Sequence, residues 1–324
     1  MASFYCKKIL SIEYHKYSST GKSIQPILKD MILNGHHVFF CLIIIYEKSM
    51  EDIVLIYTVT LDPSESVVGK GINISLILKK LGIDSIATGI VNHKNVEQVA
   101  EELDKAEIEN QFIEQKRGIK ITARNQQKLL DYLKVLKAGD ILVIAGSFAK
   151  GIDPVYLTDL AKVADKKAAG LVVDVPYENV LDILPMNPLL IKPNETELKH
   201  WFEKDDKEVT TKELINMAHN LVVKGAQHVL LSLGANGAAI VNMMDALMAH
   251  APEIKEVDST GSGDALLGTF LAGLLKGYTP VRNLADAIAA GSDTAQSEWL
   301  TDFRTTPALQ KQVIARRVTF EEAE

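Results

Sequence analysis

Residues 258–264 read Asp-Ser-Thr-Gly-Ser-Gly-Asp, and the apolar run Ala-Leu-Leu-Gly-Thr-Phe-Leu-Ala follows at 265–272. This pattern predicts a glycine-rich loop that leads into a buried helix. The first amide groups of a helix lack partners within it and its dipole is positive at that end, so the loop suits an anion. Gly261 and Gly263 carry no Cβ, which lets a phosphate approach the backbone closely. Asp264 is placed to accept a proton from a hydroxyl that attacks this phosphate; the alternative is an ordinary helix N-cap.

Outward from this loop, strand-like and helix-like segments alternate along the chain. Runs rich in apolar residues predict strands at 51–60, 84–91, 140–145, 170–175, 189–191 and 229–232. The spacing of apolar residues predicts helices at 96–106, 129–136, 154–163 and 210–223. This alternation predicts an α/β fold with a mostly parallel sheet covered by helices, in which ligands bind beyond the carboxyl ends of the strands.

The composition is that of a soluble globular protein, with 324 residues, 47% hydrophobic and 24% charged. A net charge of −7 argues against nucleic acid or an anionic membrane as partner, because both attract basic proteins. The two cysteines, Cys6 and Cys41, support neither a disulfide framework nor a cysteine zinc site, so a cytoplasmic location is expected. The apolar run 38–46 is too short to span a bilayer.

Residues 1–49 differ from the rest of the chain and are expected to be an atypical N-terminal extension. They contain both cysteines and show no clear helical or strand period between Lys7 and His37. From Met50 the sequence changes to a β-rich run at 51–60. We therefore expect a functional domain at 50–304, followed by a C-terminal tail at 305–324 that is helical or poorly ordered.

Two further segments place polar residues after predicted strands. Asn194 and Glu197 would share one face of the first turn of a helix. Their oxygens suit Mg²⁺ beside a phosphate, but the same spacing fits a capping box with Asn194 as N-cap. Residues 232–237, Ser-Leu-Gly-Ala-Asn-Gly, either let a nucleotide lie against bare backbone or form a hairpin turn.

A third segment, Gly-Lys-Gly-Ile-Asn at 69–73, opens a predicted helix at 74–81 that ends before Gly82. In a functional interpretation, the glycines and Asn73 hold the hydroxyls of a sugar. A turn followed by a helix explains the glycines almost as well.

Taken together and in this order, these motifs resemble the PfkB (ribokinase-like) carbohydrate kinases. Residues 258–264 are similar to the C-terminal signature of that family, with Ser262 where alanine is usual, and 69–74 are similar to its N-terminal signature. Segments 58–63, 191–194 and 289–295 resemble the branch that contains 1-phosphofructokinase and tagatose-6-phosphate kinase. The resemblance implies a ribokinase-like three-layer fold, with the kinase domain at 50–304.

The resemblance also implies roles for the matching residues. Asp264 would deprotonate the sugar hydroxyl, beside backbone amides of Gly261, Ser262 and Gly263 that bind the transferred phosphoryl group. Asn194 and Glu197 would order Mg²⁺. The residues expected to contact ATP are Lys192, Ser232, Leu233, Gly234, Ala235, Asn236, Gly237 and Gly263. Those expected to face the sugar phosphate are Gly69, Lys70, Gly71, Asn73, Arg117 and Lys120.

The implied activity is phosphorylation of fructose 1-phosphate to fructose 1,6-bisphosphate by ATP with Mg²⁺. Departures from the family lie on the sugar side, because only four residues separate Pro63 from Val68, where the family has a sugar-binding Asp and lid strands. We therefore expect a β-lid that is reduced or missing. Since the lid commonly makes the dimer contact in this family, a monomer or weak homodimer is expected. The alternatives are a tagatose-6-phosphate kinase and a nucleotide-binding remnant without an acceptor site.

Overall fold

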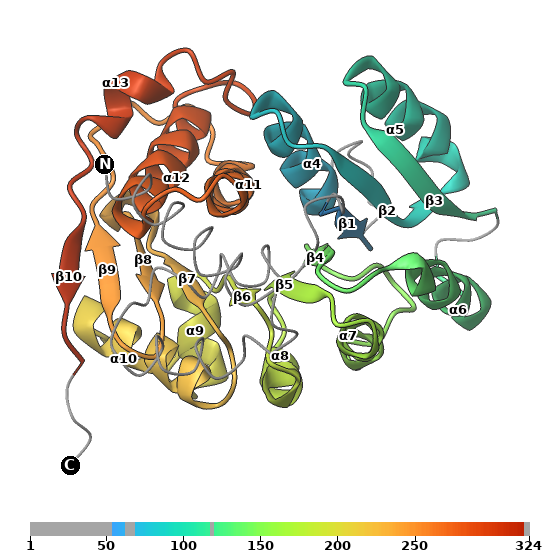
Figure 1. Ribbon diagram of the computed structural model, residues 1–324, viewed down its shortest axis with the longest axis horizontal. Helices are drawn as coiled ribbons and strands as arrows, with labels where there is room; N and C mark the ends of the chain where they lie inside the picture. The colour runs from blue at the N-terminus through green and yellow to red at the C-terminus, as the bar shows by residue number, and fades with distance from the viewer. Residues whose placement is uncertain (1–53, 62–68, 117–119, 321–324) are drawn as a thin grey trace, which may run out of the picture. The chain divides into compact units, whose positions relative to one another are not determined.

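The computed structural model describes residues 54–61, 69–116 and 120–320. The expected extension at 1–49, the shortened stretch between Pro63 and Val68 and the expected phosphate ligand Arg117 therefore lie outside the described residues. All the described strands belong to one ten-stranded sheet in the order β10-β9-β8-β7-β6-β5-β4-β1-β2-β3 (Figure 1). Neighbouring strands are parallel from β3 to β7 and antiparallel from β7 to β10. The sheet is thus mixed and mostly parallel, as the alternation in the sequence predicts.

The strands of this sheet are short, and most agree with the predicted segments. They are β1 (Ile56–Thr60), β2 (Ser85–Asn92), β3 (Glu109–Gln115), β4 (Ile141–Ala145), β5 (Gly170–Asp174), β6 (Leu190–Ile191), β7 (Val229–Ser232), β8 (Ala238–Val241), β9 (Ala246–Ala249) and β10 (Arg316–Val318). Each residue of β1 and β4 is buried, as expected for central strands covered on both faces.

The helices connect these strands and cover both faces. They are α4 (Lys70–Lys80), α5 (His93–Lys105), α6 (Ala123–Tyr132), α7 (Tyr156–Lys166), α8 (Val180–Ile183), α9 (Glu195–Trp201), α10 (Thr211–Val223), α11 (Ser262–Leu275), α12 (Pro280–Ala295) and α13 (Thr306–Gln310). Figure 1 shows α4, α5, α11 and α12 on one face of the sheet, and α6 to α10 on the other. The result is a three-layer α/β/α arrangement.

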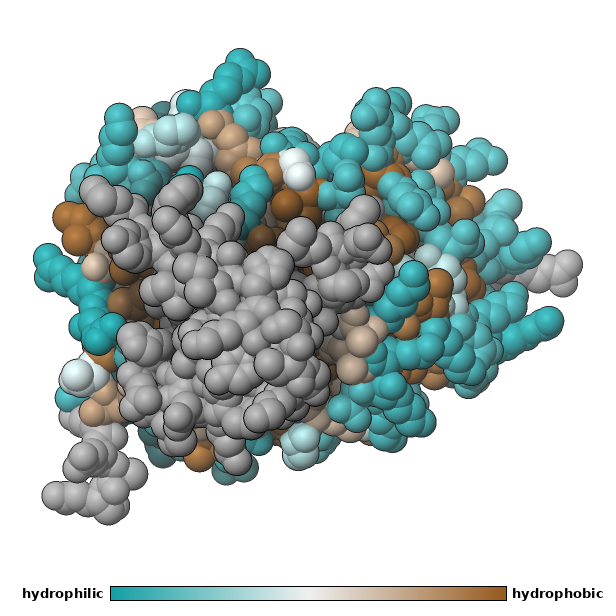
Figure 2. Space-filling view, in the orientation of Figure 1, coloured by the Kyte–Doolittle hydropathy of each residue, from teal (hydrophilic) through white to brown (hydrophobic). Residues whose placement is uncertain are grey.

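Each face of the sheet has its own hydrophobic core. The larger core joins apolar residues of β4, β5 and β7, among them Leu142 and Ile144, to α6, α7 and α10. On the opposite face, Ile72 of α4 packs with Val91 of β2 and Leu103 of α5. Polar side chains dominate the outer surface over α5 and α6 in the space-filling view (Figure 2). None of the described helices is long and apolar enough to cross a membrane.

The register of the central strands aligns their carboxyl ends. Thr60 of β1 pairs with Ala145 of β4, and Ala145 pairs with Asp174 of β5. The first turns of α4 and α11 bring further polar residues to this end. At the opposite end, a turn with Ala168 at φ 52° connects α7 to β5. Side chains that follow β1, β4, β5, β6 and β7 therefore gather at one edge, where α/β proteins bind ligands.

The segment 305–324, expected to be helical or poorly ordered, contains the short helix α13 and also a strand. β10 pairs antiparallel with β9 and extends the edge of the sheet. The sequence pattern did not indicate this strand, because it is three residues long and two of them are exposed arginines.

Candidate active site

A buried carboxylate between two ammonium groups lies at the carboxyl end of the sheet. Asp174 is the last residue of β5 and is 0% exposed. Lys192, which follows β6 and is 4% exposed, places its Nζ 3.1 Å from Asp174 Oδ1. Its backbone N–H donates to the carbonyl of Val173, which fixes the chain at this point. Lys70, the first residue of α4, brings its Nζ to 3.3 Å from the same Asp174 oxygen.

The neighbouring carboxylates stabilise the charged form of Lys70. Burial alone would lower the pKa of Lys70, but the charges of Asp174, Asp264 and Glu197 raise it above its ordinary value. The second carboxylate oxygen, Asp174 Oδ2, is buried and has no hydrogen-bond partner among the residues that the structure describes. Buried polar atoms are normally satisfied by a protein group, water or an ion, so this oxygen points to a ligand of the site.

Asp264 lies in the first turn of α11, where the sequence places it, and is 3% exposed. Its Oδ2 accepts a 2.7 Å hydrogen bond from Nδ2 of Asn73 on α4. Burial, together with the charge of Asp174, raises the pKa of Asp264 to about 6, although the bond from Asn73 and the nearby charges of Lys70 and Lys192 act in the opposite direction. At neutral pH the carboxylate is mostly ionised, yet it accepts a proton far more readily than an exposed aspartate.

The start of α11 presents free backbone amides beside these charges. The amide of Ser262 donates to the carbonyl of Ser259 at 3.1 Å, which differs from the expectation that it binds phosphate. The amides of Gly263 and Asp264 have no acceptor among the described residues. A Cβ built on Gly263 would be 3.4 Å from Lys192 Nζ, so the ammonium group lies directly beside the start of the helix. Two amides, the helix dipole and a buried cation therefore converge on one point.

Asn194 and Glu197 form the capping box that the sequence left as one of two interpretations. Asn194 Oδ1 accepts from the backbone N–H of Glu197 at 2.8 Å, and Glu197 Oε2 accepts from the N–H of Asn194 at 2.9 Å. Glu197 is half-buried, and burial raises the pKa of its carboxyl. Its Oε1 makes no hydrogen bond within the described part of the chain. The cap holds the start of α9 and leaves one carboxylate oxygen of Glu197 available.

The oxygen atoms present fit Mg²⁺. Asp174 Oδ2 has no partner in the described part of the chain, and the Oε1 of Glu197 is a second oxygen of the hard type that Mg²⁺ prefers. Within the described residues no group of three or more His, Cys, Asp or Glu side chains is arranged to hold a metal ion. Such a site is consistent with Mg²⁺, which keeps several waters and is often completed by substrate phosphates.

The loop after β7 lies beside the start of α9. Both the backbone N–H and the hydroxyl of Ser232 donate to the carbonyl of Pro193, at 3.0 and 3.3 Å. Gly237 has φ 92°, and a Cβ there would be 2.0 Å from the carbonyl oxygen of Ala249, so the hairpin itself requires this glycine. Leu233 is buried. The loop residues that reach solvent are Gly234, Ala235 and Asn236.

Gly69 and Gly71, at the start of α4, have a packing role. A Cβ on Gly69 would be 2.3 Å from Cγ2 of Thr60, and one on Gly71 would be 2.6 Å from Oγ1 of Thr60. These glycines thus let α4 begin directly against the end of β1. Of the two expected phosphate ligands, Lys120 is exposed and Arg117 lies outside the described residues.

The whole arrangement matches a known family. Residues 61–303 match the model of the pfkB family carbohydrate kinases. The chain belongs to this family. A D-tagatose-1-phosphate kinase of Bacillus licheniformis is 34% identical over 254 residues, which are 72% of this chain and 83% of that protein. A 1-phosphofructokinase of Bacillus subtilis is 29% identical over 287 residues, 76% of this chain and 94% of that protein.

Solved structures agree on the fold. The tetrameric inhibited form of phosphofructokinase-2 from Escherichia coli superposes with a TM-score of 0.71 at 22% identity, covering 80% of this chain and 99% of that one. As a pfkB-family member, this protein is a carbohydrate kinase, an enzyme that transfers a phosphoryl group to a sugar hydroxyl.

One residue of the pfkB kinase cluster was not assigned from the sequence. Asp174 ends a buried apolar strand, and this position alone does not distinguish a strand cap from a ligand. The available signal was a carboxylate at the carboxyl end of a fully buried parallel strand, the end where such folds bind ligands. Only the strand order places it between Lys70 and Lys192.

Proposed function

We propose that this kinase transfers the terminal phosphoryl group of ATP to the 6-hydroxyl of a ketose 1-phosphate, and that fructose 1-phosphate, which gives fructose 1,6-bisphosphate, is its substrate. The observation that carries the proposal is the ionised carboxylate of Asp264, held by Asn73 at the start of α11 beside the free amides of that helix. The proposal places the kinase domain at 50–304.

Asp264 acts as the base in this proposal. With a pKa of about 6, its carboxylate is ionised at neutral pH and accepts the proton of the attacking hydroxyl. The hydrogen bond from Asn73 occupies Oδ2 and fixes the orientation of the carboxylate, which leaves Oδ1 for the sugar. Asn73 Oδ1 is buried and makes no hydrogen bond within the described ranges, so it is suited to accept one from a second sugar hydroxyl.

The charge of the moving phosphoryl group is stabilised by groups that are already in place. The amides of Gly263 and Asp264 donate to its oxygens, and Lys192 and Lys70 supply positive charge that Asp174 holds in position. In this proposal the role of Gly261 is to form the turn, which has φ 81° at that residue. These groups are fixed before the reaction, so little reorganisation is required as charge develops.

Asp174 and Glu197 are the residues that would hold Mg²⁺. Mg²⁺ held there would offset the negative charge of the nucleotide phosphates. Asn194 contributes indirectly, because its side chain caps α9 and so orients Glu197. The bonds of Ser232 to Pro193 hold the loop after β7 beside the start of α9. This position supports a nucleotide site at the exposed residues 234–236 of that loop.

A coupled assay with a panel of acceptors tests the proposal. The panel contains fructose 1-phosphate, tagatose 1-phosphate, tagatose 6-phosphate and fructose 6-phosphate, each with ATP and Mg²⁺. We expect the highest kcat/KM with fructose 1-phosphate and a loss of about 10²- to 10⁴-fold in kcat for Asp264→Asn, the range of one general base. The control is Asp286→Asn on α12, a carboxylate that pairs with Arg282.

Three results would contradict this proposal. Preference for tagatose 1-phosphate, the substrate named for the Bacillus licheniformis relative, would reassign the acceptor. Full activity of Asp264→Asn would show that Asp264 is not the base. Binding of ATP by calorimetry without turnover of any ketose phosphate would identify a nucleotide-binding remnant.

A further inference from the structure

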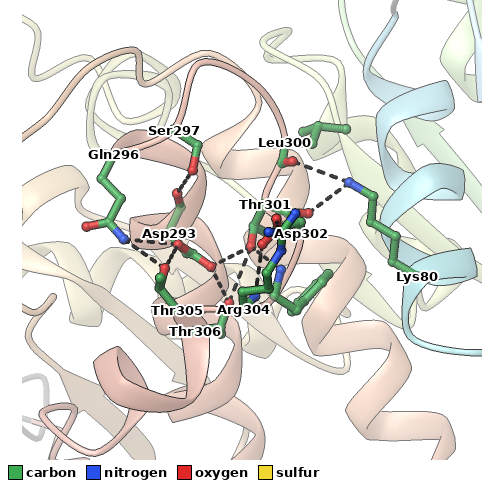
Figure 3. A network of polar contacts seen from close by, with 11 residues as sticks. Lys80, Asp293, Gln296, Ser297, Leu300, Thr301, Asp302, Arg304, Thr305 and Thr306 are labelled. Carbon is green, nitrogen blue, oxygen red and sulfur yellow. Dashed lines mark hydrogen bonds and ion pairs between the residues drawn. The ribbon is translucent and has the colours of Figure 1, made fainter.

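A second buried carboxylate, Asp293, lies on α12 and does not belong to the cluster around Asp174. It is 2% exposed and accepts hydrogen bonds from hydroxyl groups of the segment that follows its helix (Figure 3). Thr301 Oγ1 donates to it at 2.6 Å, Thr306 Oγ1 at 2.5 Å, and Thr305 Oγ1 makes a third contact. Gln296 Nε2 adds a fourth bond at 3.0 Å. Burial alone would raise the pKa of Asp293, but these donors hold it below its usual value, so the carboxylate stays charged.

The segment bound by Asp293 is also held from α4. Lys80, the last residue of that helix, donates through Nζ to the carbonyls of Leu300 and Thr301, at 3.3 and 2.8 Å. The backbone N–H of Thr301 donates to Thr294 Oγ1 at 3.1 Å. Figure 3 shows Lys80 and Asp293 approaching this segment from different elements. Residues 300–306 are therefore fixed at both sides by charged groups.

The side chain of Leu300 carries this restraint to the start of α11. It is 5% exposed and packs with Ile77 of α4 and Ala265 of α11. A Cβ built on Gly261 would be 2.7 Å from Leu300 Cδ2, so Leu300 fills the space against the Gly261 turn. Gly261 precedes the two free amides, those of Gly263 and Asp264, by two and three residues.

We propose that Asp293 is a positioning residue for phosphoryl transfer: by tying down residues 300–306 it holds Leu300 against Gly261 and thereby fixes the amides of Gly263 and Asp264. The inference rests on the function proposed above and adds a residue that touches no substrate. Reacting groups must be held closely, since a displacement of about 1 Å can cost ~100-fold in rate. Because Leu300 fills the space against Gly261, a shift of Leu300 is expected to move the turn that carries these amides.

Two substitutions of Asp293 test this role against a merely structural one. Asp293→Asn keeps an acceptor oxygen of the same size, whereas Asp293→Ala removes all four bonds. The matched control is Asp140→Asn, which alters another buried carboxylate, one that accepts backbone amides of Leu55 and Lys137 near the amino end of β4. All variants are assayed at a temperature where circular dichroism shows them folded.

The expected result is a split between kcat and KM. Asp293→Ala is expected to lower kcat by about 10- to 100-fold, and Asp293→Asn by a smaller factor, with the KM values for ATP and sugar phosphate within about threefold of wild type. Asp140→Asn is expected to leave kcat unchanged while lowering the melting temperature. Unchanged kcat in Asp293→Ala, or an equal fall in Asp140→Asn, would overturn the proposal.

Leu300→Ala tests whether Asp293 acts through Leu300. If Asp293 acts through Leu300, the loss of kcat in the double variant Asp293→Ala/Leu300→Ala is no larger than that of the more severe single variant. Multiplication of the two single effects would show that Asp293 acts by another path, and would contradict the inference.

Hydrogen exchange separates this inference from the proposed function. Asp293→Asn is expected to speed the exchange of the hydrogen-bonded amides within 261–265, those of Ser262 and Ala265, by about tenfold relative to wild type. The β5 amides are expected to be unchanged, and this comparison needs no substrate. If wild type fails to turn over ketose phosphates while this difference is present, the proposed function fails and the positioning contact stands. If wild type is active and exchange at 261–265 does not change, the positioning role is wrong.

Discussion

The side-chain amide of Asn73 and the carboxylate of Asp264 are joined by a 2.7 Å hydrogen bond across 191 residues of sequence. This bond connects the first turn of α4 to the first turn of α11. The two segments that resemble family signatures therefore meet at one buried carboxylate. Its protonation depends on both segments, which leads to the first prediction.

The pH dependence of kcat/KM is expected to show an acid limb near pH 6, because Asp264 must be ionised to act as a base and its pKa is raised to about 6. Asn73 stabilises the ionised form, so Asn73→Ala is expected to raise this pKa and move the limb to higher pH. Asn125→Ala, which removes another buried amide bond on α6, is the control and is expected to leave the limb in place. An acid limb that stays at the same pH, or moves to lower pH, in Asn73→Ala would contradict the assignment of this limb to Asp264.

The two lysines at Asp174 are expected to differ in their effect on stability. Lys192 is almost fully buried, so Lys192→Met leaves the buried carboxylate with one partner and is expected to cost about 3–5 kcal/mol in urea unfolding. The Lys70 side chain is 40% exposed and its pair is partly screened, so Lys70→Met is expected to cost at most about 1 kcal/mol. Asp174→Asn is expected to restore part of the stability lost in Lys192→Met. Equal losses for the two lysine variants would show that burial does not govern this pair.

The Gly69 position is expected to be limited by contact with Thr60. Gly69→Ala places a methyl group 2.3 Å from Cγ2 of Thr60 and is expected to lower the free energy of unfolding by about 1–3 kcal/mol. Thr60→Ser removes Cγ2, so the double variant is expected to be more stable than Gly69→Ala alone. A double-mutant cycle by urea denaturation measures this coupling, and additive losses would argue that the glycine is needed for another reason.

The contribution of Asp293 to stability is expected to depend on pH. Its pKa is lower in the folded protein than in the unfolded chain, so its stabilising effect is fully present above the unfolded value of about 3.9 and is lost as pH falls through the folded value. Near pH 7, Asp293→Asn is expected to be less stable than wild type by about 2–4 kcal/mol, since buried hydroxyls lose a charged acceptor. Urea titrations from pH 7 down to about pH 2.5 should show a constant difference between the two proteins above about pH 4 and a shrinking difference below it. A difference that stays constant throughout, or one that grows on acidification, would contradict the stated sign.

Much of the fold follows from local patterns. The runs 141–145 and 170–174 are apolar at almost every position, which is typical of parallel strands buried on both faces, and both form such strands. β10 is different, since Arg316 and Arg317 resemble a solvated segment and pairing with β9 is decided by tertiary contact. The expected helix at 129–136 begins earlier, at Ala123, because Thr122 provides an N-cap that the leucine spacing does not reveal.

The candidate site is predictable in part for a physical reason. Asp264 and its loop are contiguous, so the sequence shows them together. The partners of Asp264 come from other elements, and no local pattern states that Asn73 donates to it or that Asp174 lies between two lysines. For residues 194 and 197 the spacing is compatible with both a capping box and a metal site, and the three-dimensional structure shows that the capping-box bonds form.

The turn around Ala168 is a suitable attachment point for a label on this enzyme. It joins α7 to the amino end of β5, so the length of a complete buried strand separates it from Asp174. A fluorophore or a surface linker attached there would be separated from the cluster around Asp174 by the length of β5. Single molecules tethered in this way could be followed through successive turnovers.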